Sequence, residues 1–378
     1  MSTADARRPA FAGPFGRVIR FFRNWSTSQT AYPLGYVAAL DGSRGLMTLG
    51  VMLAHTRMAL FGGAMVYMDV FFCMSGYLIT SLLIAEHDKH GAISLKKFYV
   101  RRLRRLYPAL TAMLAALLVF SALLSPEFRL RATEAAVSFA YLSDYWRAFG
   151  GVGVHYTAHT WSLAVEEQFY ILWPAAFILL IRRHGISWAA VAIVFAAAVG
   201  FALWRIWLTY EGASIARLYN SFDTRADALL AGCGLALLLR LVDLEAHPRL
   251  SSICANSLLP LAVFMVALGF SADANWHSYY YFSPLLGAIP ALVGITGLLQ
   301  HRRTLMHAVY EQPVAVFCGR ICYGLYIWHY PVFVVVADNI QPAYRYISVF
   351  LIGWPVTFAL ATASYVLIER RFMRTRPL

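Results

Sequence analysis

Long apolar segments separated by short basic turns run through almost the whole chain. A helix needs about twenty predominantly apolar residues to cross the hydrocarbon core of a bilayer. Segments of that length recur throughout, and the predicted spans cover 37–60, 66–86, 107–125, 160–181, 187–208, 223–242, 256–272, 281–300, 313–337 and 345–368. The pattern therefore predicts an all-α, polytopic membrane bundle of about ten transmembrane helices.

The segment 133–150 departs from this pattern, because it carries Asp144 and Arg147 and is short for a span. Lys and Arg concentrate in the cytoplasmic turns of membrane proteins. If 133–150 does not cross the membrane, every basic turn falls on the same side as both chain ends. If it crosses, all later clusters change sides. We therefore predict that 133–150 is re-entrant or lies in the interface, covered by protein or a water-filled cavity.

Composition supports a membrane protein, since the 378 residues are 60% hydrophobic and 13% charged. A soluble domain keeps about a quarter of its residues charged. The net charge of +13 comes from basic residues that lie mainly in turns. There they serve topology, anionic lipid or an anionic ligand, and no nucleic-acid partner is expected. The five cysteines are odd in number and mostly lie in apolar segments, so neither a disulfide framework nor a metal site is predicted.

The same pattern predicts three regions. Residues 1–35 form a basic cytoplasmic arm, 36–372 the transmembrane domain, and 373–378 a cytoplasmic tail. The expected location is the cell inner (plasma) membrane, with several spans and both termini in the cytoplasm.

Three polar residues in the first two spans carry candidate chemistry: Arg44, His55 and Asp69. A charged side chain at mid-membrane costs roughly 3 kcal/mol, so each needs a reason to be there. Arg44 and His55 are eleven residues apart. On a helix they fall within about 20° of each other and roughly 16 Å apart along the axis. A polar stripe of this kind predicts an internal path.

His55 and Asp69 lie near the predicted outer ends of adjacent, antiparallel spans, so contact between them is expected. A carboxylate that orients a histidine makes a general base. The structural alternative is a buried polar pair that joins two helices.

The basic run between the second and third spans predicts an anion site. It contains Lys96, Lys97, Arg101, Arg102, Arg104 and Arg105. Arg forks grip phosphate bidentately, and an Arg-x-x-Arg spacing puts two guanidinium groups on one side of a helical turn. The alternative is that this charge serves topology and lipid headgroups. Two pairs fit the spacing, Arg101 with Arg104 and Arg102 with Arg105.

The segment HTWSLAVEEQFYILWP brings two acidic residues, Glu166 and Glu167, into the next span. His159, Ser162, Glu166 and Tyr170 recur at helical spacing and line one face. We expect the carboxylates to shape the site, with interfacial solvation as the alternative. Aromatic residues on the predicted outer side could bind sugar or form the interfacial belt, and the belt is favoured: Trp146, Tyr156, Trp276, Tyr279, Tyr280 and Tyr281.

Seven sequence blocks follow one another along the chain: LDGSRGLMTLGVMLAH, MDVFFCMSGYLIT, GAISLKKFYVRRLRRLYPAL, HTWSLAVEEQFYILWP, FDTRADALLAG, GRICYGLYIWHYPVF and SYVLIERR. In this order they resemble integral-membrane acyltransferase family 3, which includes polysaccharide and lipopolysaccharide O-acetyltransferases. The blocks extend over roughly residues 36–372.

The resemblance implies transfer of an acyl group, commonly acetyl, from cytoplasmic acyl-CoA to a hydroxyl of a cell-surface glycan or glycolipid. It implies that Arg44 and His55 are an essential pair and that Arg-x-x-Arg cations bind the donor, with no metal. The family's Arg-x-x-Arg falls on Arg102 and Arg105, although Arg101 with Arg104 fits the spacing equally well. His55 is then either the base or a transient acyl carrier. Some relatives carry a fused esterase-like domain, so the resemblance implies that any such periplasmic partner of this chain would be a separate protein.

Two other functions fit parts of the pattern. A transporter or flippase of a lipid-linked or small anionic substrate also has polar stripes in its helices. A membrane-bound O-acyltransferase of another family would instead place an intramembrane histidine such as His329 at its centre.

Overall fold

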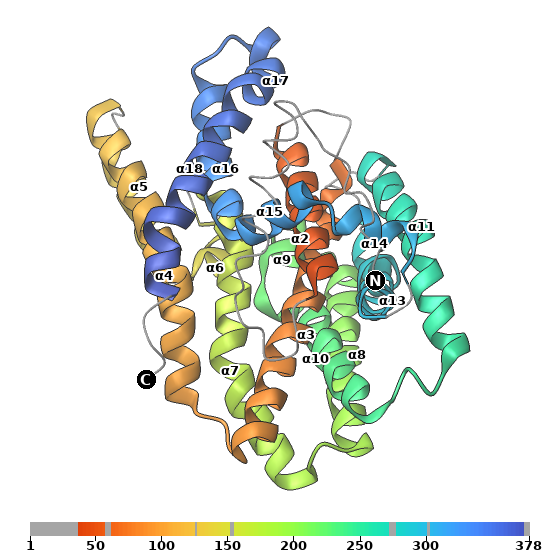
Figure 1. Cartoon of the computed structure of the whole chain (residues 1–378). Helices are drawn as coiled ribbons and strands as arrows, with labels where there is room; N and C mark the ends of the chain where they lie inside the picture. The colour runs from red at the N-terminus through yellow and green to blue at the C-terminus, as the bar shows by residue number, and fades with distance from the viewer. Residues whose placement is uncertain are drawn as a thin grey trace, which may run out of the picture.

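The protein is an all-helical bundle (Figure 1). The computed structural model describes residues 37–56, 62–124, 127–151, 155–271, 277–300 and 303–373, and these contain no strand. The first half comprises α2 (Ala38–His55), η1 (Gly62–Ala64), α3 (Met65–His90), α4 (Leu95–Leu124), α5 (Phe128–Phe139), α6 (Ser143–Ala148), η2 (Ala158–Thr160), α7 (Trp161–His184) and α8 (Trp188–Tyr210).

The second half begins with a short segment, α9 (Ile215–Asn220) and η3 (Phe222–Thr224), that leads into α10 (Ala226–Leu241). It continues with α11 (Pro248–Ser271), α12 (Tyr279–Ser283), η4 (Pro284–Ala288), α13 (Ile289–Leu298), α14 (Leu305–Tyr310), α15 (Pro313–Arg320), α16 (Cys322–Asp338), η5 (Pro342–Tyr344), α17 (Arg345–Ser348), η6 (Val349–Gly353), α18 (Trp354–Ser364), η7 (Tyr365–Glu369) and α19 (Arg370–Met373). The basic arm 1–35, residues 374–378 of the predicted tail and Trp276 lie outside the described residues.

Seven helices among the described residues are long and apolar enough to cross a membrane, or eight if α15 and α16 form one bent span. Their outward faces carry large exposed apolar side chains, such as Leu123, Leu203 and Val263. The all-α polytopic fold is therefore confirmed. The count is lower than the ten spans predicted, because α10 has 16 residues and α2 carries Asp41, Arg44 and His55.

The segment between α4 and α7 follows the path of a re-entrant hairpin. Phe139 and Tyr141 contact the ring of Tyr107, with ring centroids 5.4 and 5.3 Å away. The chain then returns along α4, and Tyr156 packs 6.4 Å from Phe120. Because Tyr107 and Phe120 are about 20 Å apart along α4 at 1.5 Å per residue, the chain travels along α4 and comes back. This path agrees with the prediction for 133–150.

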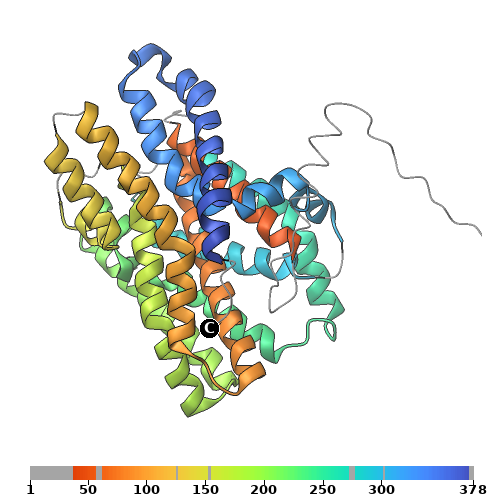
Figure 2. The same ribbon diagram turned by 60° about the vertical axis from the view of Figure 1, so that its left-hand side comes forward.

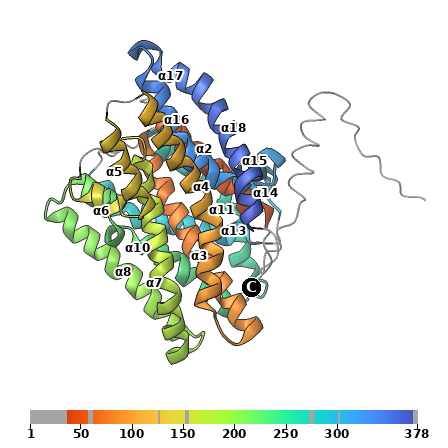
Figure 3. The same ribbon diagram turned by 90° about the vertical axis from the view of Figure 1, so that its left-hand side faces the viewer.

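Helix α3 lies inside the bundle, where it packs against both α7 and α10 (Figures 1 and 3). Glycines bring the backbones of α3 and α10 into contact. A Cβ at Gly76 would lie 1.9 Å from the Leu229 carbonyl oxygen, and one at Gly232 would lie 1.9 Å from that of Cys73. Small residues permit close helix approach where lipid offers no hydrophobic driving force.

A sharp bend separates α15 from α16, whose axes differ by 74°. Both helices pack against α2, and α16 then pairs with the last long helix of the chain (Figure 2). Gly319 at the end of α15 permits this packing, since a Cβ there would lie 1.8 Å from the Asp41 carbonyl oxygen. The bend therefore directs the side chains of α16 toward α2.

The turns 91–94 and 185–187 lie at one end of the bundle, which we call the basic end (Figure 1). Helix α3 ends at the first of these turns, so its start and the neighbouring end of α2 at His55 lie toward the opposite, far end. We predict that single cysteines in both turns are labelled from the cytoplasm, because basic turns stay on that side. The measurement is reaction with an impermeant maleimide in intact cells and in inverted vesicles. Labelling of the 185–187 turn from outside would mean that 133–150 crosses the membrane after all.

Candidate active site

Three histidines from separate parts of the chain meet in the far half of the bundle. We call His55, His159, His329 and the neighbouring Tyr330 the histidine centre. His55 ends α2, and its Nδ1 lies 2.9 Å from Nε2 of His329 in α16. The ring centroid of His159 lies 5.3 Å from that of His329. The ring of Tyr330 packs against His55 and His159, and its centroid lies 5.0 Å from the ring centroid of each.

Backbone contacts assign the proton positions in the pair of His55 and His329. Nδ1 of His329 lies 2.6 Å from the Tyr326 carbonyl oxygen and 3.1 Å from that of Leu325. A carbonyl only accepts, so Nδ1 of His329 carries the proton, and in the neutral ring Nε2 holds the lone pair. Nδ1 of His55 must then donate to it. A neutral His55 therefore presents a lone pair on Nε2, the state that a base or nucleophile requires.

The arginine centre lies nearer the basic end and consists of Arg44, Arg102, Arg105, Glu166 and Glu167. The charges of Arg102, Arg44 and Arg105 all act on Glu166, and those of Arg102 and Arg105 act on Glu167. Neither acidic side chain is exposed, and Oε1 of Glu167 is buried without a hydrogen-bond partner in the described ranges. Buried charges persist where they are paired, so these groups form one electrostatic unit.

Neighbouring side chains hold the arginine centre in place. Nη2 of Arg44 donates to Sγ of Cys322 at 3.2 Å. The guanidinium of Arg102 lies over the ring of Tyr170, 4.3 Å from its centroid. Tyr170 is hydrogen-bonded to Ser75, which also bonds Glu166. Cation–π contact and hydrogen bonding together fix the orientation of the Arg102 fork.

The structure distinguishes the two Arg-x-x-Arg pairs. Arg101 is directed away from the arginine centre and forms a 2.7 Å ion pair with Glu86 of α3. Arg104 is three residues further along α4 and shares the face of Arg101. Arg102 and Arg105 occupy the adjacent face and belong to the arginine centre. Lys96 and Lys97 are exposed.

The expected contact between His55 and Asp69 is wrong. Asp69 is buried in α3, where it accepts a hydrogen bond from Nη1 of Arg225 at 2.9 Å and another from the Tyr279 hydroxyl. A buried carboxylate is held most strongly by an opposite full charge, and Arg225 at the start of α10 supplies it. His55 is bonded to His329 instead. Asp69 thus stabilises helix packing behind the histidine centre.

The Tyr279 contact also corrects the prediction that Tyr279 and Tyr280 belong to an aromatic belt. Both side chains are fully buried, with 0% of their surface exposed. The hydroxyl of Tyr279 is bonded to Asp69, and the ring of Tyr280 lies 5.9 Å from the Arg225 guanidinium. They are parts of the buried polar network between α3, α10 and α12.

Polar side chains connect the two centres along α7 and α16. The Tyr326 hydroxyl bonds Ser162 and donates to the His159 carbonyl oxygen at 2.8 Å. Ser162 is one helical turn from Glu166, and Tyr326 is one turn from His329. The predicted polar face of α7, from His159 to Tyr170, is thus directed inward.

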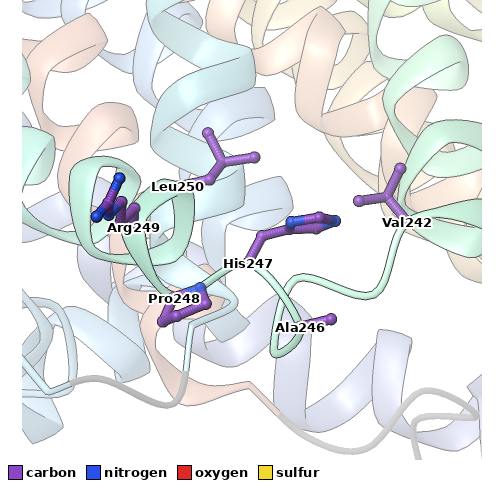
Figure 4. Close-up of a pocket in the computed structure, with 6 residues that line it drawn as sticks. All are labelled: Val242, Ala246, His247, Pro248, Arg249 and Leu250. Atoms are coloured by element: carbon purple, nitrogen blue, oxygen red, sulfur yellow. The ribbon is translucent and has the colours of Figure 1, made fainter.

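A separate depression lies where α10 is linked to α11, away from both centres (Figure 4). Its volume is about 460 Å³, and it is lined by Val242, Ala246, His247, Pro248, Arg249 and Leu250. None of these residues belongs to either centre. Among the described residues, no group of His, Cys, Asp and Glu side chains is arranged to hold a metal ion.

Sequence reasoning did not assign roles to His159, Ser75 or Cys322. His159 had a signal, since it begins the inward face of α7. Ser75 and Cys322 had none, because a serine and a cysteine in apolar helices usually only pack. His329 was considered only for a different enzyme family, and the structure pairs it with His55.

Comparisons with known proteins identify the family of the chain. An acyltransferase domain family matches residues 37–368. The chain is 29% identical over 350 residues to the peptidoglycan O-acetyltransferase OatA of Listeria monocytogenes serovar 1/2a, covering 90% of this chain and 56% of that protein. It is 27% identical over 355 residues to the O-acetyltransferase OatA of Staphylococcus aureus strain NCTC 8325, covering 92% of this chain and 59% of that protein.

The chain thus spans less than two thirds of the length of these curated relatives. No solved structure is significantly similar to it. The family match extends from the start of α2 into η7 and includes every residue of the histidine and arginine centres. The protein is a polytopic membrane protein that belongs to the acyltransferase domain family.

Proposed function

We propose that the protein transfers an acetyl group from cytoplasmic acetyl-CoA to a hydroxyl of a cell-envelope glycan. The observation that carries the proposal is the pairing of a cationic centre with a basic histidine farther along the same helix, α2. The two matched OatA proteins are named O-acetyltransferases, one of them of peptidoglycan, and this favours a glycan acceptor.

In this proposal the arginine centre holds the donor. The phosphates of CoA bind Arg102 and Arg105, which approach from the basic end, and Arg44 lies deeper on α2. Charge-assisted hydrogen bonds to phosphate are among the stronger polar contacts in proteins. The pantetheine arm then extends along the polar side of α2, and the thioester reaches Nε2 of His55. That path is roughly 16 Å long at 1.5 Å per residue between Arg44 and His55.

The proposed setting is the inner membrane, with both termini and the donor in the cytoplasm and the acceptor on the other side. Membrane lipid surrounds the bundle, and the acceptor is a glycan or glycolipid hydroxyl. The basic turns at one end support the orientation.

Purified protein in lipid nanodiscs tests the reaction. With acetyl-CoA and envelope glycan, it should release CoA thiol and form an alkali-labile acetyl ester on the glycan. Mass spectrometry of cell-surface glycans, with and without the protein, should show the same ester. The His55→Ala variant is the negative control. Transport of an intact anionic substrate without thiol release would instead support a transporter.

A further inference from the structure

His159 is buried with its backbone held tightly and its ring unsatisfied. Only 2% of the surface of His159 is exposed. The His159 carbonyl accepts from the Tyr326 hydroxyl at 2.8 Å. The next residue, Thr160, donates to Ser143 at 3.0 Å. Neither ring nitrogen of His159 has a hydrogen-bond partner of normal geometry within the described part of the chain, although the Ile327 backbone interacts with the ring.

A histidine with a purely structural role would be expected to bond at least one ring nitrogen. Leaving a buried polar group unpaired costs about 1–3 kcal/mol. His329 in the same centre shows the satisfied arrangement, with partners on both nitrogens. The unpaired ring of His159 therefore indicates a group that enters only with the substrate.

The position of His159 separates it from the donor side. His55 ends the helix that carries Arg44, whereas His159 follows the re-entrant hairpin of α5 and α6. The Tyr330 ring contacts both histidines, stacked on His159 at an interplanar angle of 20° and edge-on to His55 at 89°. The two imidazoles thus flank one aromatic side chain from different elements.

We propose that His159 is a second catalytic base, which serves the acceptor hydroxyl while His55 carries the acyl group. The proposal rests on the acyltransferase function proposed above and adds a division of roles to it. His329, bonded to Nδ1 of His55, relays a proton from His55 to the leaving group.

The proposed reaction has two steps. Nε2 of His55 attacks the thioester carbon, the C–S bond breaks, and the Nδ1 proton of His55 passes to Nε2 of His329. That proton then neutralises the departing thiolate, which leaves N-acyl-His55 and CoA thiol. In the second step, the acceptor hydroxyl gives its proton to His159 and its oxygen attacks the acyl carbon. The C–N bond breaks, and His159 returns the proton to His55.

The test separates the two half-reactions. Nanodisc protein receives acetyl-CoA labelled in the acetyl group, first alone and then with an N-acetylhexosamine oligosaccharide. His159→Gln should still release thiol in a single burst and retain label on the protein. Acetyl transfer to the oligosaccharide should fall by about 10²–10⁴-fold, the usual contribution of a base. His155→Gln is the matched control, because His155 is exposed and bonded to Asp338.

Transfer by His159→Gln within twofold of wild type would overturn the proposal. So would loss of the burst and of the protein label in a folded variant, since His159 would then serve the donor step. A His159→Ala variant gives an independent readout, because added imidazole should partly restore transfer if a base is missing. If wild-type protein released no thiol at all, the proposed acyltransferase function itself would fail.

Discussion

Replacing His55 with alanine is expected to reduce the rate of acyl transfer by about 10²–10⁴-fold or more, since a general base usually contributes a rate factor of that size. The physical reason is the lone pair on Nε2, which the hydrogen bond to His329 orients. Removing the ring removes both the base and any site for a covalent acyl group. The measurement is acetyl-CoA-dependent ester formation by purified protein at matched expression.

His90→Ala is the control for this variant, because His90 is an exposed histidine at the C-terminal end of α3, near the basic end of the bundle. It should keep wild-type activity. Membrane insertion of His55→Ala should persist, while its thermal stability should fall modestly, because Nε2 of the buried His329 loses its partner. If His55→Ala retained more than about half of wild-type activity, its assignment to the reaction would be wrong.

The second large effect is expected from removing Arg102 and Arg105 together. Each charge-assisted hydrogen bond to phosphate contributes roughly 1.5–3 kcal/mol. The double alanine variant should therefore bind acyl-CoA at least one to a few orders of magnitude more weakly. Lysine at both positions should restore binding only in part, because an ammonium group cannot reproduce the bidentate fork. Affinity is measured by equilibrium binding of acetyl-CoA to purified protein.

The chain supplies a matched control, the double alanine variant of Arg101 and Arg104. It removes the same charge at the same spacing, but from the face of α4 that bonds Glu86. We expect it to bind acetyl-CoA within a few-fold of wild type. Protease accessibility checks that both variants keep their topology, which the remaining cations should preserve. Equal losses in the two variants would mean that the basic run acts only through its overall charge.

Local patterns determined most of the fold. Continuous apolar runs predicted the spans, because a single apolar segment in lipid can satisfy all its backbone hydrogen bonds internally only as a helix. Basic turns identified 133–150 as the segment that does not cross, and the contacts of Tyr107 and Phe120 agree. Helical spacing alone also predicted that His159, Glu166 and Tyr170 share one face.

Tertiary structure decided which residues meet. His55 and His329 are 274 residues apart, and Asp69 and Arg225 are 156 apart, so spacing within one helix carries no information about either pair. The choice between the two Arg-x-x-Arg pairs depended on how α4 is rotated against α7. That rotation is fixed by contacts between the two helices: the Tyr99 hydroxyl donates to the Ile171 carbonyl oxygen at 2.8 Å, and the Arg102 guanidinium lies over the ring of Tyr170. The sequence by itself therefore supplied candidate residues such as His55, Arg102 and Glu166, while interhelical packing separated Asp69 from His55 and paired His55 with His329.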